Sequence, residues 1–225
     1  MIRGIFFLLV VFASSTVIAQ HQQPDTLNRF DEKGRKDGYW EKRDVGDLLI
    51  YKGRFDHGRP VGKFIYYYPD TKIEAEIEHS YDGLIHYAKA VTYHHNGKIM
   101  SKGTYKEKKK HGKWEYFSPE GKLLSIENYQ DGWKEGKTVI YHKNGRIAEE
   151  QYWKDGYEDS LWTTYNENGN IIMTRYYTRG KLNGEIKTYY DSGAIKMKGQ
   201  YKNGEKTGTW IYYEENGKIE EKENY

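Results

Sequence analysis

The stretch that decides the fold runs from Gly112 to Glu135 and reads GKWEYFSPEGKLLSIENYQDGWKE. Its pattern returns one period later from Gly136, as GKTVIYHKNGRIAEEQYWKDGYED, and again from Gly184 and Gly208. Self-similarity at a fixed period is the sequence signature of a repeat architecture. The chain is therefore expected to consist of copies of one small unit.

Eight units can be placed in register along the chain. They begin at Gly38, Gly62, Ala88, Gly112, Gly136, Ser160, Gly184 and Gly208. Every interval is 24 residues except the second, which is 26 because two residues are inserted near Asp82 and Gly83.

Each unit contains the signals of one β-hairpin. The sixth residue is aromatic in seven of the eight units, a Gly follows four residues later in six units, and Leu or Ile stands two residues beyond that position in all eight. Asn often precedes the Gly, and Asn-Gly closes hairpins because both residues tolerate positive φ. An aromatic residue then closes the second strand in most units. We expect positive φ at the turn glycines Gly121, Gly145, Gly169, Gly193 and Gly217.

The predicted fold is all-β. Residues 38–225 are expected to form an elongated single-sheet meander, or solenoid, of about eight 24-residue β-hairpin repeats. At about 4.8 Å per strand, such a sheet is on the order of 75 Å long. No stretch has the length and 3.6-residue periodicity of a substantial helix.

Composition indicates what stabilises this fold. The chain has no Cys, so no disulfide framework supports it, whereas Tyr alone supplies 23 residues. A thin layer of aromatic side chains is expected in place of a thick aliphatic core. The 36 Lys and Arg residues are nearly balanced by 33 Asp and Glu residues, and the two signs alternate along the chain. This pattern argues against nucleic acid as a partner.

The N-terminal residues 1–19 have the pattern of a signal peptide. Arg3 precedes an apolar run from Ile5 to Ala13, and small residues lead to Ala19. Cleavage near Ala19 would make the protein periplasmic or extracellular, and an uncleaved N-terminal anchor is the alternative. Residues 20–37 are expected to be an N-terminal segment in which residues 28–37 form a degenerate half-repeat that caps the array.

The units in residues 38–225 resemble the MORN-repeat variant of bacterial proteins. The shared pattern is a Gly, an aromatic residue two positions on, Tyr three further, a Gly turn, and Tyr before a second Gly. Proteins of this kind, including the YwqK-like group, are often described as antitoxins, and MORN repeats are associated with protein contacts and phospholipids. The resemblance implies a binding function. A signal peptide fits an immunity or scaffold role outside the cytoplasm better than neutralisation of a cytoplasmic toxin.

Catalytic and cofactor motifs are not recognisable in the sequence. The segment Gly132–Thr138 looks like a phosphate-binding loop, but it is one residue too short and is expected to precede a strand instead of a helix. None of the eight histidines recurs at ligand spacing, and the adjacent residues His94 and His95 would point to opposite faces of a strand. We therefore expect no enzyme activity, no cofactor and no metal.

Two sets of residues are candidate binding sites. Residues three and five of each unit share one face, where a row of rings could stack sugars or grip an extended peptide, or could simply fill the thin sheet. This candidate face comprises Trp40, Trp114, Tyr116, Trp162, Trp210 and Tyr212. A second set, expected in the loop between two units, could contact an anionic ligand or remain solvated: Lys106, Lys108, Lys109, Lys110 and Lys113.

The sequence thus predicts an exported, non-enzymatic binding or scaffold protein, possessing an immunity-like or antitoxin-like role and an unidentified protein partner. The alternative is a binder of an envelope glycan or lipid headgroup that uses the aromatic face. The pattern does not predict an oligomeric state.

Overall fold

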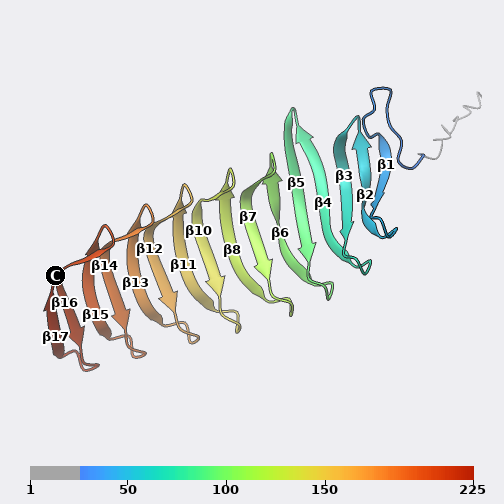
Figure 1. Ribbon diagram of the computed structural model, residues 1–225. Coiled ribbons are helices and arrows are strands. Elements are labelled where there is room, and N and C mark those ends of the chain that lie inside the picture. The colour runs from blue at the N-terminus through green and yellow to red at the C-terminus, as the bar shows by residue number, and fades with distance from the viewer. Residues whose placement is uncertain (1–25) are drawn as a thin grey trace, which may run out of the picture.

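The computed structural model describes residues 26–225, which form one open antiparallel sheet of 17 strands (Figure 1). Each strand pairs with its neighbours in chain order, and β9 and β10 both pair with β8, so together they occupy one strand position. The all-β meander predicted from the sequence is confirmed. No helix in this part of the chain is long and apolar enough to cross a bilayer. The predicted signal peptide lies outside the described residues.

The strands in chain order are β1 (Gly38–Arg43), β2 (Leu49–Asp56), β3 (Arg59–Tyr67), β4 (Ile73–Asp82), β5 (Ile85–Tyr93), β6 (Ile99–Lys106), β7 (Lys109–Phe117), β8 (Leu123–Gln130), β9 (Trp133–Lys134), β10 (Gly136–Tyr141), β11 (Ile147–Lys154), β12 (Tyr157–Tyr165), β13 (Ile171–Thr178), β14 (Lys181–Tyr189), β15 (Ile195–Lys202), β16 (Glu205–Tyr213) and β17 (Ile219–Asn224).

Two kinds of turn connect the strands. Within a unit, the turn glycine adopts a left-handed conformation, as predicted, with φ of 87°, 86°, 92°, 87° and 85° at Gly121, Gly145, Gly169, Gly193 and Gly217. Between units, two consecutive left-handed residues make the turn, for example Asp155 at 51° and Gly156 at 81°. Such two-residue turns match the right-handed twist of the strands that they join.

The first residue of a unit marks an irregularity in strand pairing. At the joint between β11 and β12 the register shifts between Glu150 and Tyr152, and Ser160 on the facing strand has φ of 59°. Glycine stands at this position in six of the eight units because a left-handed residue is needed there.

The joint between β4 and β5 is the exception. Its pairing is regular from Ala75 to Asp82, and the turn still contains only two residues, Gly83 and Leu84. The two inserted residues therefore lengthen β4 to ten residues, which removes the irregularity and explains why Ala88 can replace glycine. This longer hairpin reaches beyond its neighbours in Figure 1.

Most of the buried side chains lie on one side of the sheet, which we call face one. It carries the third residue of every unit, with exposed fractions between 1% and 9%: Trp40, Phe64, Ala90, Trp114, Thr138, Trp162, Ile186 and Trp210. Strand alternation places the second and fourth residues on the opposite side, which we call face two.

Each third residue packs on the hairpin that precedes it. The Trp114 ring lies over Gly103, where an added Cβ would come within 2.2 Å of the ring, and Trp210 lies over Gly199 in the same way. Where the preceding hairpin carries a larger side chain, the next third residue is small, as with Ile77 followed by Ala90. Volume is therefore matched between neighbouring units, as in a close-packed core.

The aromatic rings on face one form a ladder from unit to unit, and third-residue rings do not stack on one another in it. Third-residue rings instead contact the aromatic residues that close second strands. Tyr105 meets Trp114 edge-on at 4.9 Å between ring centroids, and Trp153 lies 5.4 Å from Trp162. The ladder therefore alternates between third residues and closing aromatics.

Turns also bond to turns along both edges of the sheet. The Gly156 N–H donates to the carbonyl of Lys134 in the preceding unit at 3.0 Å. At the other edge, Nε2 of His142 donates to the carbonyl of Tyr165 in the following unit at 2.9 Å, and His94 does the same to Phe117 at 2.8 Å. Two of the eight histidines thus form hydrogen bonds that join neighbouring units.

We predict that Gly103→Ala lowers the free energy of unfolding by about 2 kcal/mol, because the new Cβ forces the Trp114 ring out of its packed position. The matched control is Gly46→Ala in an exposed turn, where the change stays within about 0.5 kcal/mol. Urea titration of each variant measures these values.

A double-mutant cycle identifies the cause of this loss. In a Trp114→Thr background, which imitates the Thr138 arrangement, Gly103→Ala should cost little. An equal cost of Gly103→Ala in both backgrounds would show that ring packing does not explain the glycine.

Candidate functional site

The predicted aromatic face is largely closed in the structure. Trp40, Trp114, Trp162 and Trp210 are 9%, 2%, 7% and 2% exposed, and Tyr116 and Tyr212 are half-buried. All six side chains lie on face one, as expected from strand alternation. The four tryptophan rings are buried in contacts between units, so little of their surface is accessible to a ligand.

Lysines cover this face from the outside. A lysine two residues before the start of a unit lies over the third-residue ring of that unit, with Nζ 4.6 Å from the ring centroid for Lys36 over Trp40, 4.7 Å for Lys110 over Trp114, and 4.3 Å for Lys206 over Trp210. Lys134 lies over Trp153 in the same way, at 4.7 Å. Such cation–π contacts contribute about 0.5–1 kcal/mol each at exposed sites. Face one is therefore covered by side chains of the repeats themselves.

The basic run from Lys106 to Lys113 is not one loop. Lys106 ends β6, while Lys109, Lys110 and Lys113 belong to β7, and only Glu107 and Lys108 form the turn. Lys110 also donates to the Tyr116 hydroxyl at 2.5 Å, and Lys113 pairs with Glu115 at 2.7 Å. The five lysines thus point to different surroundings and do not form one cluster.

The long β4–β5 hairpin carries an arrangement that the sequence analysis missed. His79 occupies the place of a closing aromatic, and His86 occupies the place where other units have Lys110 or Lys206. Nδ1 of His79 and Nε2 of His86 are 2.9 Å apart, so one nitrogen donates to the other. Rings continue on both sides, since His79 contacts Phe64 at 4.9 Å and His86 contacts Tyr81 at 4.9 Å.

His79 is held in its neutral form. Burial, followed by the nearby His86, lowers the pKa of His79 to about 4. In this unit a histidine, His86, therefore stands where other units have a lysine cation, and its partner His79 is neutral. The sequence signal for this site is a histidine at the closing-aromatic position of the unit that contains the insertion.

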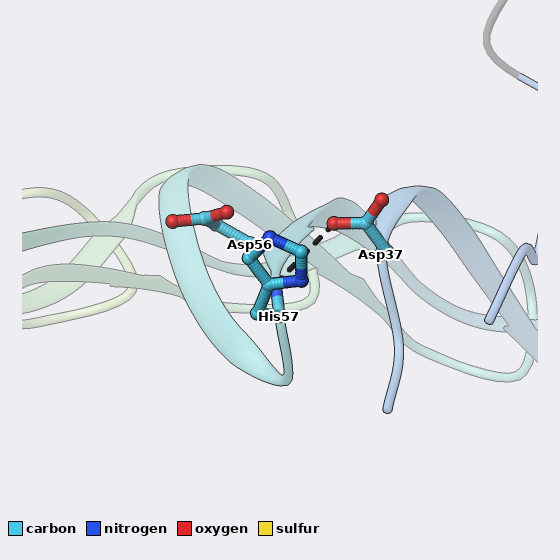
Figure 2. Close-up of side chains that lie close together, drawn as sticks. All are labelled: Asp37, Asp56 and His57. Carbon is cyan, nitrogen blue, oxygen red and sulfur yellow. Dashed lines mark hydrogen bonds between the residues drawn. The ribbon is translucent and has the colours of Figure 1, made fainter. Parts of the chain in front are cut away.

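A second polar cluster lies at the N-terminal end of the array. Asp37, Asp56 and His57 bring two carboxylate oxygens and an imidazole nitrogen within 4.8 Å of one another, as Figure 2 shows. Within residues 26–225 this is the one group of three His, Asp or Glu side chains with such spacing. The sequence analysis expected no metal site here or elsewhere.

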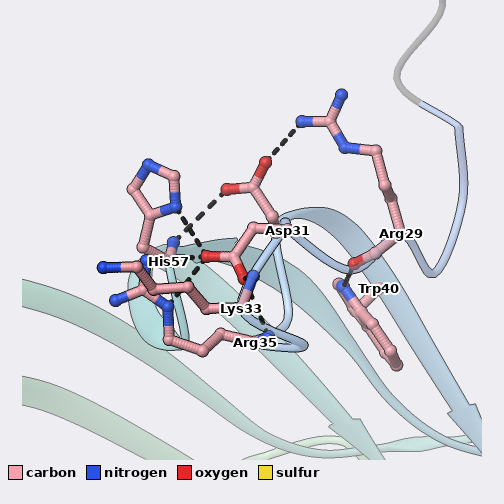
Figure 3. Close-up of polar contacts among 7 residues, drawn as sticks. Arg29, Asp31, Lys33, Arg35, Trp40 and His57 are labelled. Atoms are coloured by element: carbon pink, nitrogen blue, oxygen red, sulfur yellow. Dashed lines mark hydrogen bonds and ion pairs between the residues drawn. The ribbon is translucent and has the colours of Figure 1, made fainter.

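Hydrogen bonds of the cap account for most of this cluster (Figure 3). Asp31 accepts hydrogen bonds from the backbone N–H groups of Lys33 and Arg35 and contacts Nδ1 of His57 at 2.9 Å. These contacts, led by the backbone bond from Arg35, hold the pKa of Asp31 far below its usual value.

Asp37 is also engaged within the cap. It accepts from the His57 backbone N–H at 3.3 Å and pairs with the Arg29 guanidinium. These two contacts, the backbone bond first, lower the pKa of Asp37. A guanidinium beside the carboxylate opposes a bound cation, so the cluster stabilises the cap and is a poor metal site.

The cap also covers the outer edge of β1. The Asn28 N–H donates to the Tyr39 carbonyl at 2.9 Å, and the Trp40 indole donates to the Arg29 carbonyl at 3.0 Å. Phe30 meets the Trp40 ring edge-on at 4.9 Å, in the manner of a closing aromatic. Residues 28–40 therefore satisfy backbone groups that an edge strand would otherwise leave open.

Comparison with known proteins finds a similar repeat. The MORN repeat variant matches five stretches of the chain, namely residues 88–107, 110–131, 134–155, 182–203 and 206–225. None of the curated proteins compared with the chain matches it.

Solved structures offer only distant likenesses. The Glycosylation Associate Protein complex from Streptococcus agalactiae is similar over 50% of this chain and 18% of that chain, with 17% identity and a TM-score of 0.26. A porin-like protein from Bacteroides uniformis is similar over 64% of this chain and 61% of that chain, with 14% identity and a TM-score of 0.20. Both TM-scores are low, so neither likeness bears on function.

We predict that acid weakens the protein through His79. Because the folded-state pKa of about 4 lies below the ordinary value of 6.5, the unfolded chain binds the proton more tightly. The contribution of neutral His79 to stability is complete above pH 6.5 and is lost as the pH falls towards 4. Urea titrations at pH 7.5, 6 and 4.5 measure this loss.

The variant His79→Phe restores the closing aromatic of other units and should flatten the pH dependence over this window. The control is the exposed His95→Gln, which should behave like the parent. An unchanged pH dependence in His79→Phe would remove His79 as the cause.

Proposed function

We propose that this protein, five stretches of which match the MORN repeat variant, is a non-enzymatic binding scaffold that acts outside the cytoplasm and holds a protein partner on face two. The observation that supports this proposal is the unequal state of the two faces. No second layer of secondary structure covers either face in residues 26–225 (Figure 1), but the third residues on face one are only 1–9% exposed, whereas second residues on face two such as Lys63, Lys89 and Lys113 are exposed.

The size of face two suits a protein partner. An array of about 75 Å with strands about 27 Å long offers on the order of 2,000 Å² on each side. A standard protein interface needs about 800 Å² from each partner. Half of the array is therefore enough for one stable contact.

The chemistry of face two also suits a protein. Charged side chains such as Lys102 and Glu115, which pair at 2.7 Å, alternate there with half-buried apolar ones such as Ile126 and Val139. Mixed polar and apolar surface of this kind is typical of non-obligate interfaces.

The absence of enzyme activity remains part of the proposal. The phosphate-loop-like segment Gly132–Thr138 runs from a two-residue turn into β9 and β10, so no helix N-terminus is available to hold a phosphate. The histidine pair and the cap cluster are occupied by contacts within the fold. An immunity-like role, in which a protein is bound and held inactive, is consistent with such a surface.

Export can be tested directly. We predict that the mature protein begins at Gln20 and is recovered from the periplasmic or extracellular fraction. N-terminal sequencing and intact mass measure this, and Ala19→Arg, which places a large residue at the cleavage site, should retain residues 1–19. Recovery of the parent chain from the cytoplasm with residues 1–19 intact would overturn export. Recovery from the membrane with these residues intact would favour the uncleaved anchor.

The protein partner can be tested by lysine crosslinking in the envelope fraction followed by mass spectrometry. We predict a stoichiometric protein whose crosslinks map to lysines of face two, such as Lys89, Lys113 and Lys137. Turn lysines such as Lys108 and Lys143 serve as the internal control. Absence of a stoichiometric protein, or crosslinks confined to the turn lysines, would contradict the proposal.

A further inference from the structure

Exposed aromatic side chains gather on one part of face two. Trp133, Tyr152, Tyr157 and Tyr176 are 66%, 38%, 58% and 42% exposed and come from β9, β11, β12 and β13. We call these four residues the aromatic strip. Their chain neighbours, including Lys134 and Trp153, meet one another on face one, so alternation directs the strip to face two.

Glycines hold the rings of the strip in place. Trp133 lies against Gly156, where an added Cβ would be 2.7 Å from Cε3 of the indole. Tyr157 lies beside Gly180 in the next turn, and Tyr176 lies beside Gly184. Trp133, Tyr157 and Tyr176 therefore each rest against a glycine, while much of each side chain remains open to solvent. Such positioning reduces the entropy that a ligand must remove on binding.

The spacing of the strip follows from the repeat. Trp133 and Tyr157 hold equivalent places in successive units, and so do Tyr152 and Tyr176. Two strand spacings separate equivalent residues, which is about 10 Å. This separation is close to the length of one disaccharide in an extended β-1,4-linked glycan.

Polar groups beside the rings are balanced in charge. A shallow hollow next to Tyr157 is lined by Lys154, Asp155, Asp159, Thr178 and Arg179. Two cations and two carboxylates cancel, and together with the hydroxyl they offer both donors and acceptors. A ligand that carries many uncharged hydroxyl groups matches this set, whereas a polyanion would require an excess of positive charge.

We propose that the aromatic strip binds an extended, uncharged β-1,4-linked glycan. Pyranose rings with equatorial substituents present flat C–H faces, which pack on Trp133 and Tyr157 one disaccharide apart, while their hydroxyls bond to the groups around the hollow. A row of flat rings suits sugar faces better than a peptide, whose anchoring side chains need pockets that the strip lacks. The strip occupies only part of face two. This proposal and the protein partner proposed above are therefore tested separately.

Isothermal titration of the full mature chain with soluble hexasaccharides tests the proposal. We expect binding of the β-1,4-linked hexamer of glucose or of N-acetylglucosamine, with quenching or a shift of tryptophan fluorescence. The α-1,4-linked glucose hexamer, which curls, should bind at least tenfold more weakly. Failure of both β-linked hexamers to bind at millimolar concentration would overturn the proposal. This holds also if the crosslinking experiment described above finds a protein at the strip.

Variants locate the site. Trp133→Ala and Tyr157→Ala should each weaken binding at least tenfold, while Trp133→Phe should keep most of it. Tyr39→Ala removes a 53% exposed ring from face two at the far end of the array and should change nothing. Unfolding midpoints close to that of the parent confirm that each variant is folded. Equal weakening by Tyr39→Ala, or full affinity in Tyr157→Ala, would overturn the assignment.

Discussion

A sheet of one layer has nothing to pack against except itself, and this constraint shapes the whole molecule. The described residues supply no second sheet or helix to bury a hydrophobic face. Each hairpin therefore buries its third residue on the hairpin before it, as Trp114 does on Gly103. The glycine removes a side chain so that an indole can reach the backbone, which takes the place of an opposing layer.

The same constraint makes the two faces different. On face one, large rings must be shielded from water, and lysines such as Lys110 contribute to the shield with ammonium groups that lie over the rings. Face two carries a mixture of charged, apolar and aromatic side chains, and several of them, such as Tyr39 and Trp133, remain exposed. Face two is thus available to a partner because the side chains that stabilise the sheet are buried mainly on face one.

Variation in the repeat has local structural consequences. The two extra residues in β4 make its pairing with β5 regular, which allows Ala88 at a position that is usually glycine. In that hairpin His79 and His86 replace the usual closing aromatic and lysine, and the ring packing continues through Phe64 and Tyr81. In the middle of the array, Gly156 and Gly180 instead leave rings exposed. Individual units can therefore carry different side chains as long as neighbouring units still stack on one another.

The sequence by itself determined the 24-residue unit, the all-β meander and the left-handed turn glycines, because strand alternation and turn geometry are local properties. It did not determine that the rings of Trp114 and Trp210 are buried. Nor did it determine that Lys110 lies over the Trp114 ring or that His79 contacts His86. These outcomes depend on which residues face one another across neighbouring units. That register is set by the left-handed first residue of most units and by the length of β4, so only the tertiary structure decided which aromatic side chains are buried and which remain exposed.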